Sequence, residues 1–157
     1  MSPPESRGFA LIEALIASLL IAIAVVGFAH LVAVASAQAV MTRQSATALM
    51  LAQAKLEELR GLAWRFDADG SRVSRAELAT SPPSTLVEDL DGYVERLDRF
   101  GSSAPPDDEP HYRRRWAIAP LSALDPDTLV LQVCVYSTGR AGGAPEACVW
   151  ALRTRKP

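Results

Sequence analysis

The stretch FALIEALIASLLIAIAVVGFAHLVAVASAQAV, residues 9–40, decides the fold of this chain. Glu13 is its only formally charged residue, it contains no proline, and the rest is dominated by Ala, Leu, Ile and Val. A bilayer core requires about 20 consecutive apolar residues in a helix, so the stretch is long enough to cross a membrane. Inside lipid the backbone must satisfy its own hydrogen bonds, which makes a helix the expected state.

The helix is expected to continue through residues 41–63. Residues 44–63, QSATALMLAQAKLEELRGLA, contain good helix formers and no breaker before Gly61. A helix from about Phe9 to Leu62 would be roughly 80 Å long at 1.5 Å rise per residue. Its second half is amphipathic, with one apolar stripe at helical spacing and the charged side chains largely outside it. The predicted stripe is Leu49, Ala52, Leu56, Leu59 and Ala63, with Gln53, Lys55, Glu57, Glu58 and Arg60 outside.

The remaining residues, 64–157, are predicted to form a small head. Turn-forming residues mark loops at 67–70, 81–84 and 101–110. β-branched and aromatic residues predict strands at 112–118, 128–137 and 147–153, with a further candidate at 93–100. One long helix followed by several short strands indicates an α+β fold, in which a small antiparallel sheet packs on the amphipathic half of the helix.

Cys134 and Cys148 are the two cysteines of the chain. If a hairpin closes at residues 139–145 with these two cysteines opposite each other, their Cβ atoms lie close to the separation that a disulfide needs. The same register pairs Gln132 with Trp150 and Val130 with Leu152, and it separates an apolar face of Leu131, Val133, Val135, Val149 and Ala151. In an oxidising compartment the two cysteines would form a disulfide, and the alternative is a pair of free, buried thiols.

The charge balance gives no general attraction to nucleic acid or anionic lipid, because the formal net charge is only −2 and the pI is near 5.7. Arg113, Arg114 and Arg115 could contact DNA or an acidic partner, but in a strand they alternate between faces, and a solvated edge is the preferred interpretation. Nucleic acid is therefore not assigned as a partner. Trp116 and Trp150 are expected to pack in the core or on the sheet.

No catalytic residue, metal site or cofactor is assigned, and the chain is not expected to be an enzyme. His111 is the only histidine of the head, and a solvated loop position is the preferred interpretation over a base or a metal ligand. The sequence around Asp67, Asp69 and Gly70 resembles a calcium loop, but its register would make Arg65 the first ligand. These aspartates are instead expected to shape a turn.

The start of the apolar stretch carries the functional motif, Arg7-Gly8-Phe9-Ala10-Leu11-Ile12-Glu13. It resembles the class III signal of type IV prepilins and pseudopilins, whose usual form has Thr where this chain has Ala10. The resemblance implies that a membrane prepilin peptidase cuts between Gly8 and Phe9 and that the new amine of Phe9 is N-methylated. It also implies that Glu13 meets the amine of Phe9 in a neighbouring subunit during assembly, as expected of a carboxylate that is costly to leave alone in lipid.

The resemblance implies four segments: a leader at 1–8, a transmembrane half-helix at 9–40, an amphipathic half-helix at 41–63 and a periplasmic head at 64–157. The expected function is a structural subunit of a type IV pilus, as a minor pilin, and the alternative is a minor pseudopilin of a type II secretion system. The expected partners are other pilins or pseudopilins, the prepilin peptidase and methyltransferase, an inner-membrane assembly platform and membrane lipid.

The expected location is the bacterial inner membrane, crossed once with the N-terminus in the cytoplasm, and later the filament. Arg7 lies before the span and Arg43 follows it, so counting of positive charges favours this orientation only slightly. A more distant alternative is a secreted, soluble binding protein, because Ala35-Ser36-Ala37 has the form of a signal peptidase site with cleavage after Ala37.

Overall fold

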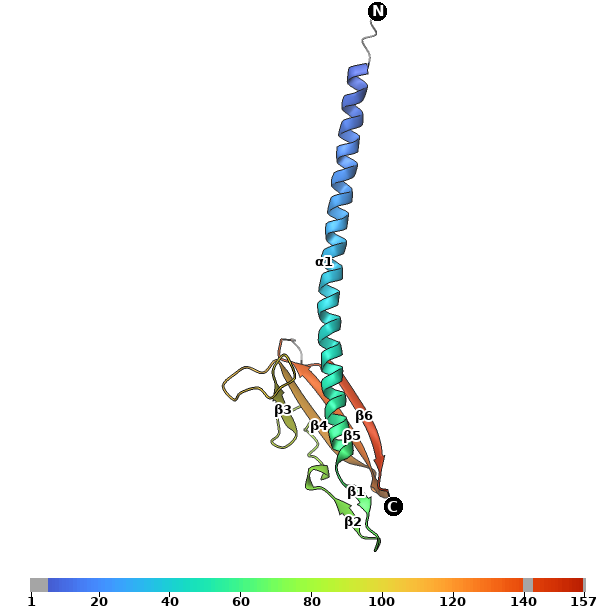
Figure 1. The fold of residues 1–157 in the computed structure, drawn as a ribbon, viewed down its shortest axis with the longest axis vertical. Coiled ribbons are helices and arrows are strands. Elements are labelled where there is room, and N and C mark those ends of the chain that lie inside the picture. Colours follow the sequence, from blue (N-terminus) through green and yellow to red (C-terminus); the bar gives the residue numbers. More distant parts are fainter. Residues whose placement is uncertain (1–5, 140–142, 157) are drawn as a thin grey trace, which may run out of the picture. The chain divides into compact units, whose positions relative to one another are not determined.

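The computed structural model describes residues 6–139 and 143–156, and for residues 6–10 it describes the backbone alone. One helix, α1, extends over Ser6–Gly61 (Figure 1). The chain divides into two compact units, Met1–Arg43 and Gln44–Pro157, and α1 contributes to both. The predicted long helix is therefore confirmed to within one turn at each end.

The head is built on a four-stranded antiparallel sheet with the strand order β3-β4-β5-β6 (Figure 1). Its strands are β3 (Val94–Leu97), β4 (Tyr112–Ser122), β5 (Asp125–Ser137) and β6 (Ala147–Thr154). The predicted α+β fold is confirmed. The strands β4 and β5 are longer than predicted because they extend to a tight turn, in which Ser122 pairs with Asp125.

Two very short strands were not predicted. β1 (Trp64–Phe66) and β2 (Arg72–Ser74) pair with each other and are joined by the predicted turn at residues 67–70. A single turn of 3₁₀ helix, η1 (Ala76–Leu78), follows them. Strands of three residues are too short to show a period-2 pattern, which is why the sequence gives no signal for them.

The second half of α1 packs on one face of the sheet. Ala48, Ala52, Leu56 and Leu59 are buried, and their spacing of three to four residues puts them on one side of the helix. The strands supply every second side chain to this core, because side chains alternate between the two faces of a sheet. The sheet residues of the core are Leu97, Tyr112, Trp116, Ile118, Leu129, Leu131, Val133, Val135 and Ala151.

The apolar stripe of α1 is rotated relative to the predicted one. Leu49 is 41% exposed, whereas Ala48 is fully buried. Each residue turns the helix by about 100°, so the two neighbours cannot both face the sheet. Ala63 lies beyond the end of the helix. The predicted positions of Leu49 and Ala63 in the stripe are therefore wrong, and Ala48 takes the place of Leu49.

Lys55 is the main exception to the predicted polar face, because its side chain is buried against the sheet and only 7% exposed. Its ammonium group Nζ donates to Glu58 Oε1 at 2.9 Å and to Glu95 Oε1 at 2.7 Å. It also lies 4.2 Å from the centre of the Trp116 ring. These partners compensate for the loss of water, which is what allows a lysine to occupy a core-facing position.

Glu95 of β3 joins the helix to two strands. Arg114 of β4 donates to Glu95 Oε2 through Nε at 2.8 Å and also through Nη2, and it donates through Nη1 to the carbonyl oxygen of Leu51 in α1 at 2.9 Å. Burial alone would raise the pKa of Glu95, but hydrogen bonds and charges from Lys55 and Arg114 outweigh it, so the pKa lies below its ordinary value. We call Lys55, Glu95 and Arg114 the junction cluster.

The C-terminal end of α1 is closed by the last strand. Arg153 of β6 donates to the carbonyl oxygen of Leu59 at 2.7 Å and to that of Leu62. The final carbonyl groups of a helix have no partner within the helix, so a guanidinium group there satisfies them and offsets the negative end of the helix dipole.

Replacing Glu95 by Gln is expected to lower the free energy of unfolding of the head by about 2 kcal/mol at pH 7. Lys55 and Arg114 would stay charged without their shared carboxylate. The measurement is chemical unfolding of the full-length chain in mild detergent, followed by tryptophan fluorescence. All three tryptophans lie at or after position 64 and report on the head.

The effect should shrink on acidification. Because the folded pKa of Glu95 is lowered, its ionised form stabilises the fold above the unfolded pKa of about 4.3, and this stabilisation is lost as the pH falls through the lower folded value. Glu57→Gln is the matched control, since it removes an exposed pair with Arg60 and should cost less than about 0.5 kcal/mol. Equal losses for the two variants would contradict the role of the junction cluster.

Candidate functional site

The motif with the predicted processing site lies on α1. The helical backbone runs through residues 7–13 without a break. Leader residues 1–5 and the side chain of Phe9 lie outside the described part of the chain, so the predicted cleavage between Gly8 and Phe9 stays a prediction. Phe9 and Glu13 are four residues apart, which places them on the same face of α1, about 6 Å apart along its axis.

Glu13 is exposed, and it has no ion pair or hydrogen bond with any described side chain. A chain that began at Phe9 would carry an α-amine and three unsatisfied N–H groups at the positive end of the helix dipole. A carboxylate supplied by another subunit could neutralise that end.

The unit formed by residues up to Arg43 exposes its apolar side chains. All the large aliphatic and aromatic side chains between Leu11 and Met41 are at least 43% exposed, and Phe28 reaches 70%. Among the described residues, α1 is the one helix long and apolar enough to cross a membrane, with a mean hydropathy of 2.6 in its most apolar window, none of which is buried. This helix segment is therefore not the core helix of a soluble domain, and it could be a membrane span or a signal anchor.

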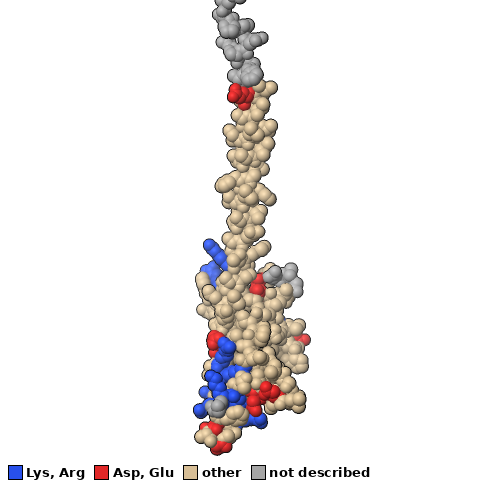
Figure 2. All heavy atoms as spheres, turned by 90° about the vertical axis from the view of Figure 1, so that its right-hand side faces the viewer, with Lys and Arg blue, Asp and Glu red and all other residues tan. Residues whose placement is uncertain are grey.

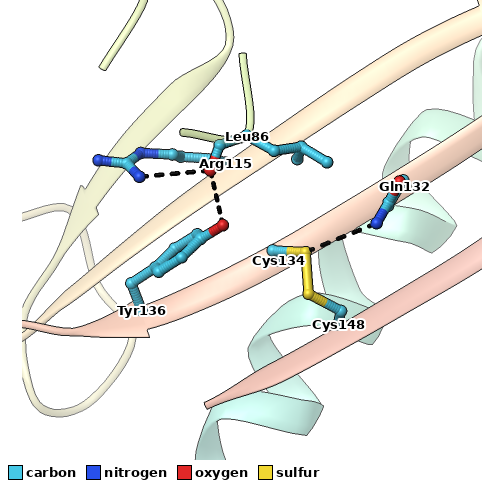
Figure 3. The surroundings of a disulfide bond; sticks show 6 residues. All are labelled: Leu86, Arg115, Gln132, Cys134, Tyr136 and Cys148. Atoms are coloured by element: carbon cyan, nitrogen blue, oxygen red, sulfur yellow. Dashed lines mark hydrogen bonds between the residues drawn. A yellow bond between two sulfur atoms is a disulfide. The ribbon is translucent and has the colours of Figure 1, made fainter. Parts of the chain in front are cut away.

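The predicted disulfide is present. Cys134 of β5 and Cys148 of β6 are bonded, stand directly opposite each other and have their Cα atoms 4.1 Å apart (Figure 3). The two other predicted pairs of this hairpin, Gln132 with Trp150 and Val130 with Leu152, are also found. The alternative of two free, buried thiols is wrong, and Cys148 is exposed.

The three consecutive arginines do not form a solvated edge. They alternate between the two faces, as predicted, but β4 is an inner strand and the side chains of Arg114 and Arg115 are each 11% exposed. On the face away from α1, Arg115 pairs with Asp89 at 2.6 Å. The carbonyl oxygen of Leu86 accepts from both Arg115 and Tyr136, which ties the segment before β3 onto the sheet (Figure 3).

Trp116 lies in the core, whereas Trp150 is 70% exposed on β6. The packing predicted for Trp150 is therefore wrong, because its position in the hairpin directs it to the face away from α1, which the described chain leaves uncovered there.

The remaining candidate residues, His111 and the aspartates near Gly70, lie in a loop and in a turn. His111 is exposed beside the ring of Tyr112. Asp67 and Asp69 shape the turn between β1 and β2, and Gly70 adopts a positive φ of 80° there. Hydrogen bonds from the backbone and hydroxyl of Ser71 lower the pKa of Asp69. Within the described residues, no group of three His, Cys, Asp or Glu side chains is placed to hold a metal ion.

Removing the disulfide with the double variant Cys134→Ser and Cys148→Ser is expected to lower the free energy of unfolding by about 3 kcal/mol, because the bond closes a loop over a sequence separation of 14. Unfolding of the full-length chain in detergent, followed by tryptophan fluorescence, measures the loss. Reductant should destabilise the wild-type chain by the same amount and leave the double variant unchanged. An equal response of both chains to reductant would contradict this.

Comparison of the chain with protein-family models, with curated proteins and with solved structures finds no match in any of the three.

Proposed function

We propose that the chain is a structural subunit of a type IV pilus, processed by a prepilin peptidase and assembled into a helical filament as a minor pilin. One observation carries the proposal: the motif from Gly8 to Glu13 stands at the start of an unbroken helix whose apolar side chains up to Met41 have no cover within the described chain. Because the cleavage site between Gly8 and Phe9 lies before the span, the peptidase would remove only the leader, and the mature chain would keep the whole apolar helix.

The uncovered surface requires an apolar environment. Burying an aliphatic or aromatic side chain contributes about 1.5–3 kcal/mol, so a helix with this many exposed apolar side chains cannot stay in water. Lipid supplies that environment before assembly, and the packed helices of neighbouring subunits would supply it in a filament. One helix surface thus serves as membrane anchor and as filament core.

Glu13 is the assembly contact in this proposal. A carboxylate within an apolar segment costs about 2.5–3.5 kcal/mol at the bilayer centre and less near the interface. Pairing with the amine of Phe9 in another subunit would recover that cost and also set the register between the two helices. The contact needs the charge of Glu13 and a free amine, which couples assembly to processing.

A minor pseudopilin of a type II secretion system is the close alternative, since it would share the motif, the helix and the contact. The more distant alternative is a soluble secreted protein cleaved after Ala37. Its specific support is the boundary of the second compact unit at Gln44, because such a cleavage would leave that unit whole. The unbroken helix through Ala35-Ser36-Ala37 favours the pilin-like proposal.

Mass spectrometry of the mature chain is expected to find an N-methylated Phe9 at the N-terminus, purified from a host that has a prepilin peptidase. Replacing Gly8 by a bulky residue should leave the leader attached, because the peptidase needs access to the scissile bond. A mature chain that starts at Gln38 would show release by an ordinary signal peptidase and would refute the proposal.

Glu13→Ala and Glu13→Gln are both expected to insert into the membrane normally and to appear in sheared filaments at least tenfold less than the wild type. A charged hydrogen bond contributes about 1.5–3 kcal/mol, and 1.4 kcal/mol corresponds to a factor of ten. Membrane and filament fractions are compared by immunoblotting. Glu77→Ala, which removes an exposed carboxylate in the head, is the control. Wild-type incorporation of Glu13→Gln would exclude the charge pair.

A further inference from the structure

Opposite charges lie at the two ends of the sheet in the head. The loop between β3 and β4 lies at the end where β4 begins, because Tyr112 pairs with Ser137 of β5 and Leu97 of β3. The end of β6 lies at the opposite end of the sheet, because Thr154 pairs with Thr128, close to the start of β5 and the end of β4. At about 3.3 Å per residue, the 11 residues of β4 separate these ends by roughly 35 Å. Figure 1 shows the loop and the C-terminus at opposite ends of the sheet.

A cationic cleft of about 640 Å³ lies between the last turn of α1 and the end of β6. Of the described residues, four cationic ones and one carboxylate line it, together with two apolar residues and Thr154: Arg60, Arg153, Arg155, Lys156, Glu57, Trp64 and Leu152. Figure 2 shows Lys and Arg side chains gathered on this part of the head, toward the C-terminal end of the chain. We call this cleft the basic cleft.

The positive charge of the basic cleft is only partly compensated within the chain. Arg153 gives its hydrogen bonds to helix carbonyl groups, and no described carboxylate pairs with it. Burial, with a further contribution from the charge of Arg60, lowers the pKa of Arg153. Lys156 is exposed and has no carboxylate partner among the described residues.

The carboxylates of Glu57, in the lining of the cleft, and of Asp127, close to it, do not neutralise its positive charge. Asp127 is shared by two guanidinium groups, since it pairs with Arg155 at 2.9 Å and with Arg72 at 3.0 Å. Arg60 has an exposed partner in Glu57 at 2.8 Å, and exposed pairs of this kind contribute little. The cleft therefore favours an anionic occupant.

The loop at the other end carries three consecutive carboxylates, in Asp107, Asp108 and Glu109. All three residues are exposed, and none forms an ion pair with a described residue. The sequence Pro-Pro-Asp-Asp-Glu-Pro, residues 105–110, restricts the backbone of this loop.

Hydrogen bonds hold this loop at both ends. The Asp108 N–H donates to the Pro105 carbonyl oxygen at 3.2 Å, Arg96 donates to the Asp108 carbonyl oxygen at 3.2 Å, and the Thr138 hydroxyl donates to that of Pro110 at 2.6 Å. A loop that is already ordered loses less conformational entropy when it binds. We call residues 107–109 the acidic loop.

We propose that the acidic loop of one copy of this chain docks in the basic cleft of a second copy. The two sites cannot meet within one chain, because they lie at opposite ends of the same sheet. The contact is head-to-tail, and such contacts repeat from copy to copy into an open filament or a ring.

This inference rests on the proposed function, which places the contact in a filament. It adds that at least two copies of the chain are neighbours there. A three-residue loop buries far less than the roughly 800 Å² per partner of a stable isolated interface. The contact is therefore weak alone and gains strength from the simultaneous packing of the helices.

The chain contains two lysines, which makes a direct test possible. Lys55 is buried and paired, so Lys156 is the accessible side-chain amine of the head. A carbodiimide, which joins a carboxylate and an amine only when they touch, should link full-length chains in membranes into dimers and longer ladders. Mass spectrometry is expected to find Lys156 joined to the acidic loop, and Lys156→Arg should abolish the product.

Charge reversal tests the same contact with an internal rescue. Asp107→Lys with Glu109→Lys should reduce the linked dimer at least tenfold, and so should Arg60→Glu with Lys156→Glu. Combining all four substitutions should restore it, because the two sites then exchange charges. Glu77→Lys with Glu88→Lys makes the same change in net charge as the acidic-loop variant, at exposed positions elsewhere in the head, and should have no effect.

The outcomes separate this contact from the proposed function. Recovery of the chain in sheared filaments with Lys156 unlinked, or linked to a different protein, would overturn the contact and leave the filament function standing. Linked dimers in membranes without any chain in filaments would support the contact and refute the filament function. Failure of the four-substitution variant to restore the linked dimer would also overturn the contact.

Discussion

The packing of the second half of α1 on the sheet is the contact on which the head depends. Ala48 and Ala52 have small side chains, which allow the helix and the sheet to approach closely, and the alternating residues of β5 fill the space between them. The four strands have no other helix to cover their apolar face within the described chain. The amphipathic half of α1 is therefore part of the head's core.

The junction cluster gives that packing its orientation. Apolar contacts are tolerant of sliding, whereas Glu95 must meet Lys55 and Arg114 at hydrogen-bond distance, and Arg114 must also reach a carbonyl group of α1. A helix shifted by one turn would separate buried Lys55 from Glu95 and would leave Arg114 without its carbonyl acceptor in α1, at a cost beyond that of the lost apolar contact. Apolar burial thus stabilises the packing of α1 on the sheet, and the junction cluster fixes its position.

Periodic features could be predicted from the sequence and tertiary ones could not. The α+β fold and the long helix follow from composition and periodicity. The register of the β5–β6 hairpin follows from placing Cys134 opposite Cys148, which also separates an apolar face. Lys55 was misplaced because a periodicity argument classes every lysine as polar, although Ala48, Ala52 and Leu59 lie on the same side of α1. Its burial depends on Glu95 and Arg114, whose proximity to it arises only when β3 and β4 form. Trp150 was predicted to pack because it is a large aromatic residue, but it is 70% exposed, since no described element packs on the outer face of the sheet at its position.

The candidate site divides in the same way. Gly8, Phe9 and Glu13 are recognisable as a motif because their spacing is local, and the helix that carries them follows from hydropathy. The basic cleft combines residues from α1 and from the end of β6, which are about ninety positions apart in the chain, as the 2.7 Å bond between Leu59 and Arg153 illustrates. No local pattern could reveal it.

The capping of α1 by Arg153 also has a consequence for the order of folding. The strand β6 supplies Cys148 to the disulfide, Ala151 to the core and Arg153 to the helix end. Synthesis proceeds from the N-terminus, so α1 is complete long before these residues exist. The head can therefore close only after β6 has been synthesised. A chain that stopped before β6 would keep its apolar helix and lack both the disulfide and the residue that closes the end of α1.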